Sequence, residues 1–178
     1  MPHVPIELTP LTVTDQRTAL VAGEVDAALV RLPIERDGLH VIGLYDEVPV
    51  VVASIDSHLT AAEELEFADL AGEVVIVPVD DVLAADELAA EAIPGAVTPG
   101  FAAPEDTASA IEIAATGVGI VLVPMSLARL HHRRDVTFRP LRDGPTSTVA
   151  LAWVADRTTP DVDLFVGIVR GRTVRSSR

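Results

Sequence analysis

The pattern of apolar and polar residues is clearest between residues 104 and 130. Apolar side chains recur there at helical spacing, Asp106 or Thr107 can cap the helix, and Gly117 stands where a left-handed residue ends one. Residues 119–123 are then apolar and rich in β-branched side chains, which is typical of a strand covered on both faces. Together these features predict a helix–strand–helix unit of a parallel sheet.

Two helix N-termini of this unit are candidate ligand contacts. In open parallel sheets, ligands bind outside the carboxyl ends of the strands, where helix N-termini present unpaired N–H groups. The two ends here are residues 103–107 and residues 124–126, where Ser126 opens the second helix after Pro124. The hydroxyls of Thr107 and Ser126 add side-chain donors, although residues that only cap a helix would give the same sequence.

The remaining chain alternates strand and helix patterns, which predicts an α/β protein of two Rossmann-like lobes joined by two crossover strands. The expected strands are 4–11, 25–32, 73–79, 96–102 and 136–141, and the expected helices are 14–22, 86–93 and 161–169. Residues 4–32 would form a strand–helix–strand unit. The long extended segments 38–52 and 148–154 would cross between the lobes, so we expect lobe I at 1–52 and 153–178 and lobe II at 53–152.

Composition narrows the classes of function. The 178 residues carry a formal net charge of −14, and their 13 basic residues are all arginine. Such a chain is repelled by phosphate backbones, so we expect no direct binding to nucleic acid. The start of the chain lacks the basic residues and apolar core of a signal peptide, and no apolar run approaches the roughly 20 residues needed to span a bilayer. We therefore expect a cytoplasmic protein that does not enter a membrane.

Catalytic and metal-binding patterns are missing from the sequence. There is no cysteine, and the neighbours Asp56, Ser57 and His58 cannot form a catalytic triad by adjacency alone. The glycines Gly117 and Gly119 follow a helix and precede a strand, the reverse of a phosphate-binding loop. The histidines are not spaced as metal ligands, and adjacent histidines on a helix diverge. We expect no enzyme activity, no metal and no cofactor.

Five segments, in order and spacing, resemble the effector-binding domain of LysR-type transcriptional regulators. They are LVAGEVDAALVRLP at 20–33, GLHVIGLYDEVPVVV at 38–52, HL at 58–59, FADLA at 67–71 and AATGVGIVLVPMS at 114–126. The resemblance implies a type II periplasmic-binding-protein fold. It also implies a sensor in which a small molecule, often a carboxylate, binds between the lobes and changes how a tetramer holds its operator DNA.

The chain departs from the family pattern at its N-terminus. In the family, a winged helix-turn-helix, a linker helix, and the first strand and helix of the effector domain precede the segment that matches residues 4–11. We expect these parts to be absent, so the first lobe would be incomplete and the domain would have no DNA-binding module of its own. The apolar surface left uncovered would favour a homodimer or pairing with a related regulator. A solute-binding protein of the same fold is the alternative.

The resemblance also implies where a ligand would bind. In some family members an arginine at the position of Arg31 meets the effector's carboxylate, and a guanidinium can donate two parallel hydrogen bonds to that group. A surface arginine near Glu35 and Asp37 is the alternative interpretation. The expected ligand-binding residues are Arg31, Leu32, Pro33, Ala103, Pro104, Thr107, Pro124, Met125 and Ser126.

The last residues, 170–178, form the only locally basic segment and contain four arginines. Without aromatic residues or a structural motif, such a tail is more often a solvated, frayed terminus than an arm that binds nucleic acid.

Overall fold

The structure is a computed structural model that describes residues 4–175, with side chains described up to residue 171. It divides into two compact units, Met1–Tyr45 with Thr148–Arg178, and Asp46–Ser147. The boundaries between the units, at 45/46 and 147/148, both come earlier in the chain than the expected boundaries at 52/53 and 152/153. The first comes earlier because strand β3 (Pro49–Ser54) pairs with β4 (Val121–Pro124) and β5 (Val136–Pro140) inside the second unit, so it is not a connection. The second comes earlier because β6 (Ser147–Val154) belongs to the sheet of the first unit.

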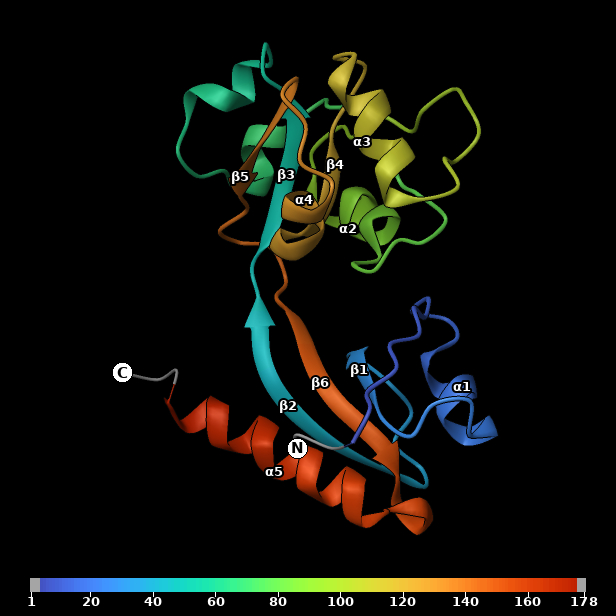
Figure 1. Cartoon of the computed structure of the whole chain (residues 1–178). Coiled ribbons are helices and arrows are strands. Elements are labelled where there is room, and N and C mark those ends of the chain that lie inside the picture. The colour runs from blue at the N-terminus through green and yellow to red at the C-terminus, as the bar shows by residue number, and fades with distance from the viewer. Residues whose placement is uncertain (1–3, 176–178) are drawn as a thin grey trace. The chain divides into compact units, whose positions relative to one another are not determined.

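The first unit is a three-stranded sheet with a helix on each face (Figure 1). The strands are β1 (Ala28–Arg31), β6 (Ser147–Val154) and β2 (Leu39–Glu47), in the order β1-β6-β2. Side chains alternate along β6: Ala150 and Ala152 pack with Leu20 of α1 (Gln16–Ala22), whereas Leu151 and Trp153 pack with α5 (Pro160–Arg175). The central strand β6 is therefore buried on both faces.

The expected strand at residues 4–11 does not form. These residues adopt no regular structure, and the side chains of Ile6 and Leu8 are 63% and 87% exposed. Pro5 and Pro10 remove two backbone donors, and no strand within residues 4–175 lies beside this segment to pair with it. The predicted strand–helix–strand unit is therefore wrong, and β1 pairs antiparallel with β6 instead.

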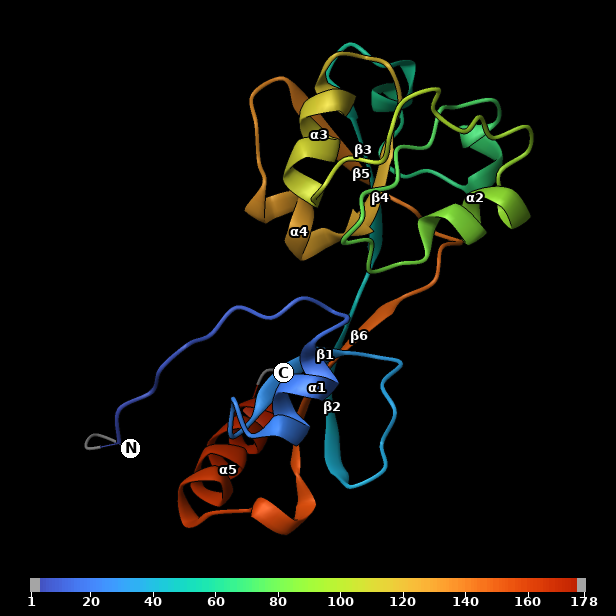
Figure 2. The same ribbon diagram turned by 90° about the vertical axis from the view of Figure 1, so that its right-hand side faces the viewer.

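The second unit is built on strand β3, which is central in the order β4-β3-β5. Strand β4 (Val121–Pro124) and strand β5 (Val136–Pro140) both pair with β3. Helices α3 (Thr107–Ala115) and α4 (Met125–Leu130) lie on one side of this sheet, and α2 (Ala85–Ala92) lies on the other (Figure 2). The short helices η1 (His58–Ala61) and η2 (Phe67–Leu70) complete this unit, and η3 (Ala155–Arg157) belongs to the first.

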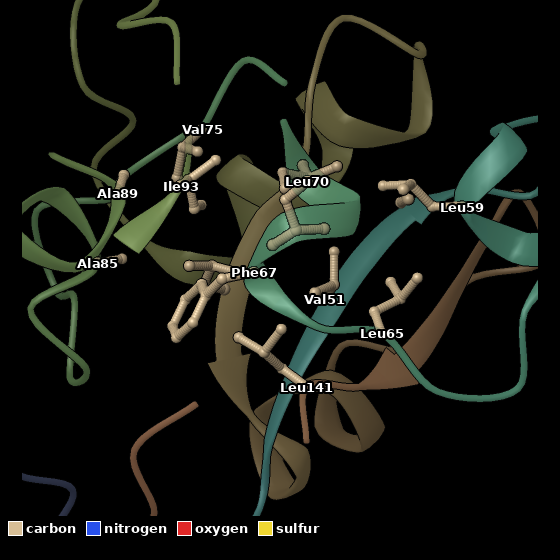
Figure 3. Close-up of a cluster of buried hydrophobic side chains, with 13 residues drawn as sticks. Val51, Leu59, Leu65, Phe67, Leu70, Val75, Ala85, Ala89, Ile93 and Leu141 are labelled. Carbon is tan, nitrogen blue, oxygen red and sulfur yellow. The ribbon is translucent and has the colours of Figure 1, made fainter. Parts of the chain in front are cut away.

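Alternation along β3 creates two separate cores. Val51 and Ala53 join the cluster on the side of α2, where Phe67, Leu70 and Leu141 are buried (Figure 3). Val50 and Val52 join the cluster on the side of α3, whose Ala110, Ile111 and Ala114 are fully buried. Every one of these β3 side chains is at most 3% exposed. The strand thus needs an apolar layer on each of its faces.

The expectation of a parallel sheet is only partly met. Within residues 4–175, β4 does not lie beside a parallel strand: its neighbour in the sheet is β3, and the two strands are antiparallel. The expected strands 73–79 and 96–102 are reduced to isolated parallel bridges, Val74 with Val97 and Val75 with Ile120. Pro94 precedes the second of these segments and Pro99 lies within it, and neither has an N–H to donate to a ladder.

The C-terminal helix is longer than expected. α5 continues to Arg175, so the segment that we expected to fray is helical up to that residue, and 176–178 lie outside the described residues. None of the helices within residues 4–175 is long and apolar enough to cross a membrane.

Gly119 provides a test of the close contact between β4 and the segment before α2. A Cβ at this position would collide with the carbonyl oxygen of Val74, which accepts a hydrogen bond from Ile120. We expect Gly119→Ala to lower the free energy of unfolding by about 1–3 kcal/mol, the usual cost of overpacking. Urea unfolding followed by circular dichroism would measure it. The control is Gly100→Ala, where a Cβ meets nothing within 4 Å. If Gly119→Ala and Gly100→Ala are equally stable, the backbone at Gly119 is not packed against Val74 as described.

Candidate functional site

Arg31 is the last residue of β1 and is half-buried. Its neighbour Val30 is 1% exposed and faces α1, so the Arg31 side chain leaves the opposite face of the sheet. Beyond it, the Leu32 N–H donates to the Thr148 carbonyl oxygen over 3.0 Å, and the Leu32–Pro33 peptide bond is cis. The three residues expected to contact a ligand thus form the end of an edge strand and the turn that follows it.

A residue that the sequence interpretation missed holds the backbone of Arg31. The Gln16 side chain accepts from the Arg31 N–H over 2.8 Å and donates to the Arg31 carbonyl oxygen over 3.2 Å. Gln16 is 6% exposed and begins α1, one turn before the buried Leu20. The sequence did hold a signal for it. Gln16 lies four residues before Leu20, so the two share one face of the helix, and a polar side chain on a buried face needs a hydrogen-bond partner.

The N-terminus of α3 is capped by Asp106 and not by Thr107. The Asp106 carboxylate accepts from the Ser109 N–H over 2.8 Å, and this backbone hydrogen bond lowers the pKa of the carboxyl below its ordinary value of 3.8. The hydroxyl of Thr107 donates to Asp80 over 2.9 Å, and the residue is 2% exposed. The Thr107 hydroxyl is therefore engaged inside the second unit.

The start of α4 is bonded to Glu47 and Val48, where β2 ends and β3 begins, and all of these residues belong to the second unit. The Met125 N–H donates to the Val48 carbonyl oxygen over 3.1 Å, and the Ser126 hydroxyl donates to Glu47 over 3.0 Å. Pro124 supplies the extended residue before the helix. The expected contacts at this N-terminus are thus close together, and their polar groups also fasten the strand end to the helix.

A groove of about 400 Å³ lies beside α2 in the second unit. It contains two of the expected ligand-binding residues, Ala103 and Pro104, and its charged lining residue is Asp86. The full lining is Val75, Val77, Pro78, Asp86, Ala89, Ala90, Ala96, Val97, Thr98, Pro99, Phe101, Ala103 and Pro104. Its volume falls in the range of small-molecule sites, and its walls are mostly apolar, as in such sites.

Among the described residues, no group of three or more histidine, aspartate and glutamate side chains is arranged to hold a metal ion. After α4, Arg133 forms surface ion pairs, with Asp135 over 2.9 Å and with Glu112 over 3.1 Å.

Comparison with known proteins decides the family. A family model described as the LysR substrate binding domain matches residues 1–173. The chain belongs to this family. The effector-binding domain of BenM, solved with its effector benzoate, superposes with a TM-score of 0.80 over 98% of this chain and 81% of that one, at 18% identity. The predicted α/β fold of the type II periplasmic-binding-protein kind is confirmed.

Two relatives within the family are regulators of transcription. The Hca operon transcriptional activator HcaR of Escherichia coli is 25% identical over 182 residues, and the HTH-type transcriptional regulator CatR of Pseudomonas putida is 32% identical over 149 residues. The matches cover 96% and 82% of this chain, but 59% and 51% of the relatives. The chain thus corresponds to little more than half the length of these LysR-type proteins.

The Asp106 cap predicts a pH dependence. Because the folded protein lowers the pKa of this carboxyl, its contribution to stability is present above the unfolded value of 3.8 and is lost as the pH falls through the folded value. Asp106→Asn keeps a capping oxygen but removes the titration. We expect the wild type to lose thermal stability relative to this variant as the pH falls below about 4. An NMR titration of the Asp106 carboxyl carbon with a midpoint at or above 3.8 would contradict the assignment.

Proposed function

We propose that the chain is the effector-sensing domain of a cytoplasmic LysR-type transcriptional regulator, without enzymatic activity, and that its effector is a small organic acid. Membership of the LysR substrate-binding family carries this proposal. The names of HcaR and CatR as transcriptional regulators support the regulatory role, and the benzoate bound to BenM supports the chemical class.

Arg31 is the proposed contact for the acid. The backbone that carries this guanidinium is fixed by hydrogen bonds on both edges of the strand. Gln16 bonds to Arg31 on one edge, and on the other the Leu32 N–H donates to the Thr148 carbonyl oxygen. A guanidinium on such a fixed base can meet the two oxygens of a carboxylate with little loss of entropy. In a chain of net charge −14, an anion gains from a local cation and is otherwise repelled.

Leu32 and Pro33 extend this proposed site in the first unit. In the second unit, Ala103, Pro104, Pro124 and Met125 are proposed to contact a ligand through backbone groups and apolar surface. The engaged hydroxyls of Thr107 and Ser126 would more readily shape the site than donate to the ligand. This division follows from the burial of Thr107 and from the bond between Ser126 and Glu47.

We also propose that the domain pairs with a second copy or with a related regulator. Exposed apolar side chains of the first unit support this proposal: Leu29 is 65% exposed, Leu164 50% and Ile168 39%. Where such side chains gather into one patch, the patch commonly marks a surface that binds another protein.

Thermal unfolding with a panel of small carboxylates tests the acid-binding proposal. We expect at least one acid to raise the melting temperature of the wild type, by about 2–4 °C for each kcal/mol of binding free energy. Arg31→Ala should abolish the increase, whereas Arg36→Ala, which removes an exposed arginine of the same unit, should keep it. Equal stabilisation of all three proteins would rule out Arg31 as the contact.

A further inference from the structure

We infer that Gln16 is a positioning residue for the ligand-binding end of β1: its side-chain amide takes the place of a neighbouring strand and fixes the backbone of Arg31. This inference rests on the proposed role of Arg31 in binding an acid. It adds a residue that would determine affinity without touching the ligand.

The register of the sheet shows why the amide is needed. Arg31 stands opposite Val149 of β6, and the next residue, Leu32, donates its N–H to Thr148. In an antiparallel pair, successive residues direct their N–H and C=O groups to alternate sides of the strand. The N–H and C=O of Arg31 therefore point away from β6, toward an edge where no strand within residues 4–175 pairs.

Gln16 makes the two backbone hydrogen bonds that a neighbouring strand would otherwise make with Arg31. Its Oε1 accepts from the Arg31 N–H and its Nε2 donates to the Arg31 carbonyl, so one side chain satisfies both groups. The orientation of the amide follows from the partners, because reversing it would set donor against donor and acceptor against acceptor. At 6% exposure, water cannot easily replace either bond.

The two hydrogen bonds from Gln16 fix the open edge of β1 at Arg31 alone. Two residues earlier, Leu29 lies on the same edge with its side chain 65% exposed, and no strand within the described part of the chain covers it. The end of β1 that carries the arginine is therefore held by a side chain of α1. The position of the guanidinium then depends on how α1 packs through Leu20, and less on what lies beside the rest of the strand.

Three variants separate this role from a general contribution to folding. Gln16→Met fills similar space without either hydrogen bond. Gln16→Glu can accept from the Arg31 N–H when ionised, but it can donate to the carbonyl only when protonated. Thr18→Glu places the same charge at an exposed position of α1 and serves as the matched control.

The readouts are the hydrogen-exchange protection of the Arg31 amide and the dissociation constant for benzoate, both at pH 7.5 and pH 5.5. We expect Gln16→Met to weaken benzoate binding roughly tenfold or more at both pH values, by analogy with residues that orient a metal ligand through a hydrogen bond. Gln16→Glu should be weak at pH 7.5 and should recover toward the wild type at pH 5.5, in affinity and in protection, because burial at this position raises the pKa of the introduced carboxyl and favours its protonated form. Thr18→Glu should match the wild type at both pH values.

Two results would overturn the inference. One is unchanged protection of the Arg31 amide in Gln16→Met. The other is reduced protection with unchanged benzoate affinity, which would leave Gln16 a purely structural role. If the wild type binds no carboxylate of the panel, the proposed function fails, and the amide protection alone decides whether Gln16 holds Arg31.

Discussion

Burial of a central strand on both faces is the constraint on which each unit depends. In the second unit this strand is β3, whose valines alternate between the cluster around Phe67 and the cluster around Ile111. In the first unit it is β6, whose alanines face α1 while Leu151 and Trp153 face α5. A strand buried in this way requires an apolar layer on each side, and helices provide most of those layers. The helix ends are then brought next to the strand ends.

This arrangement explains why the polar groups near the strand ends bond to one another. The hydroxyl of Thr107 bonds to Asp80, that of Ser126 to Glu47, and the amide of Gln16 to the backbone of Arg31. Gln16 and Thr107 are buried and have lost their water, so their polar groups need protein partners, whereas the bond of Ser126 to Glu47 lies at the surface. Donors that look available in the sequence are thus used to join elements, and a ligand must be recognised by groups that remain accessible.

The sequence predicted local structure well, because local structure depends on local patterns. The cap and end of α3, the helix α2 and the left-handed Gly117 are all confirmed, and the family resemblance is confirmed with them. Periodicity reports whether a face is buried but does not identify the neighbour. That is why residues 4–11 alternate without forming a strand, and why β4 was expected to be parallel. Gln16 was missed for the same reason, since its partner is fifteen residues away.

The likeness to BenM at 18% identity establishes the fold and leaves the chemistry of the site to the residues of this chain. The fold can place an arginine at the end of β1, but the sheet alone does not hold it there. The edge at Arg31 faces no strand in the described residues, and an open edge would let the strand end move. A side-chain amide from the helix that precedes β1 removes this freedom locally. Rigidity at the proposed contact can therefore arise within one helix and one strand, whatever covers the open edge beside Leu29.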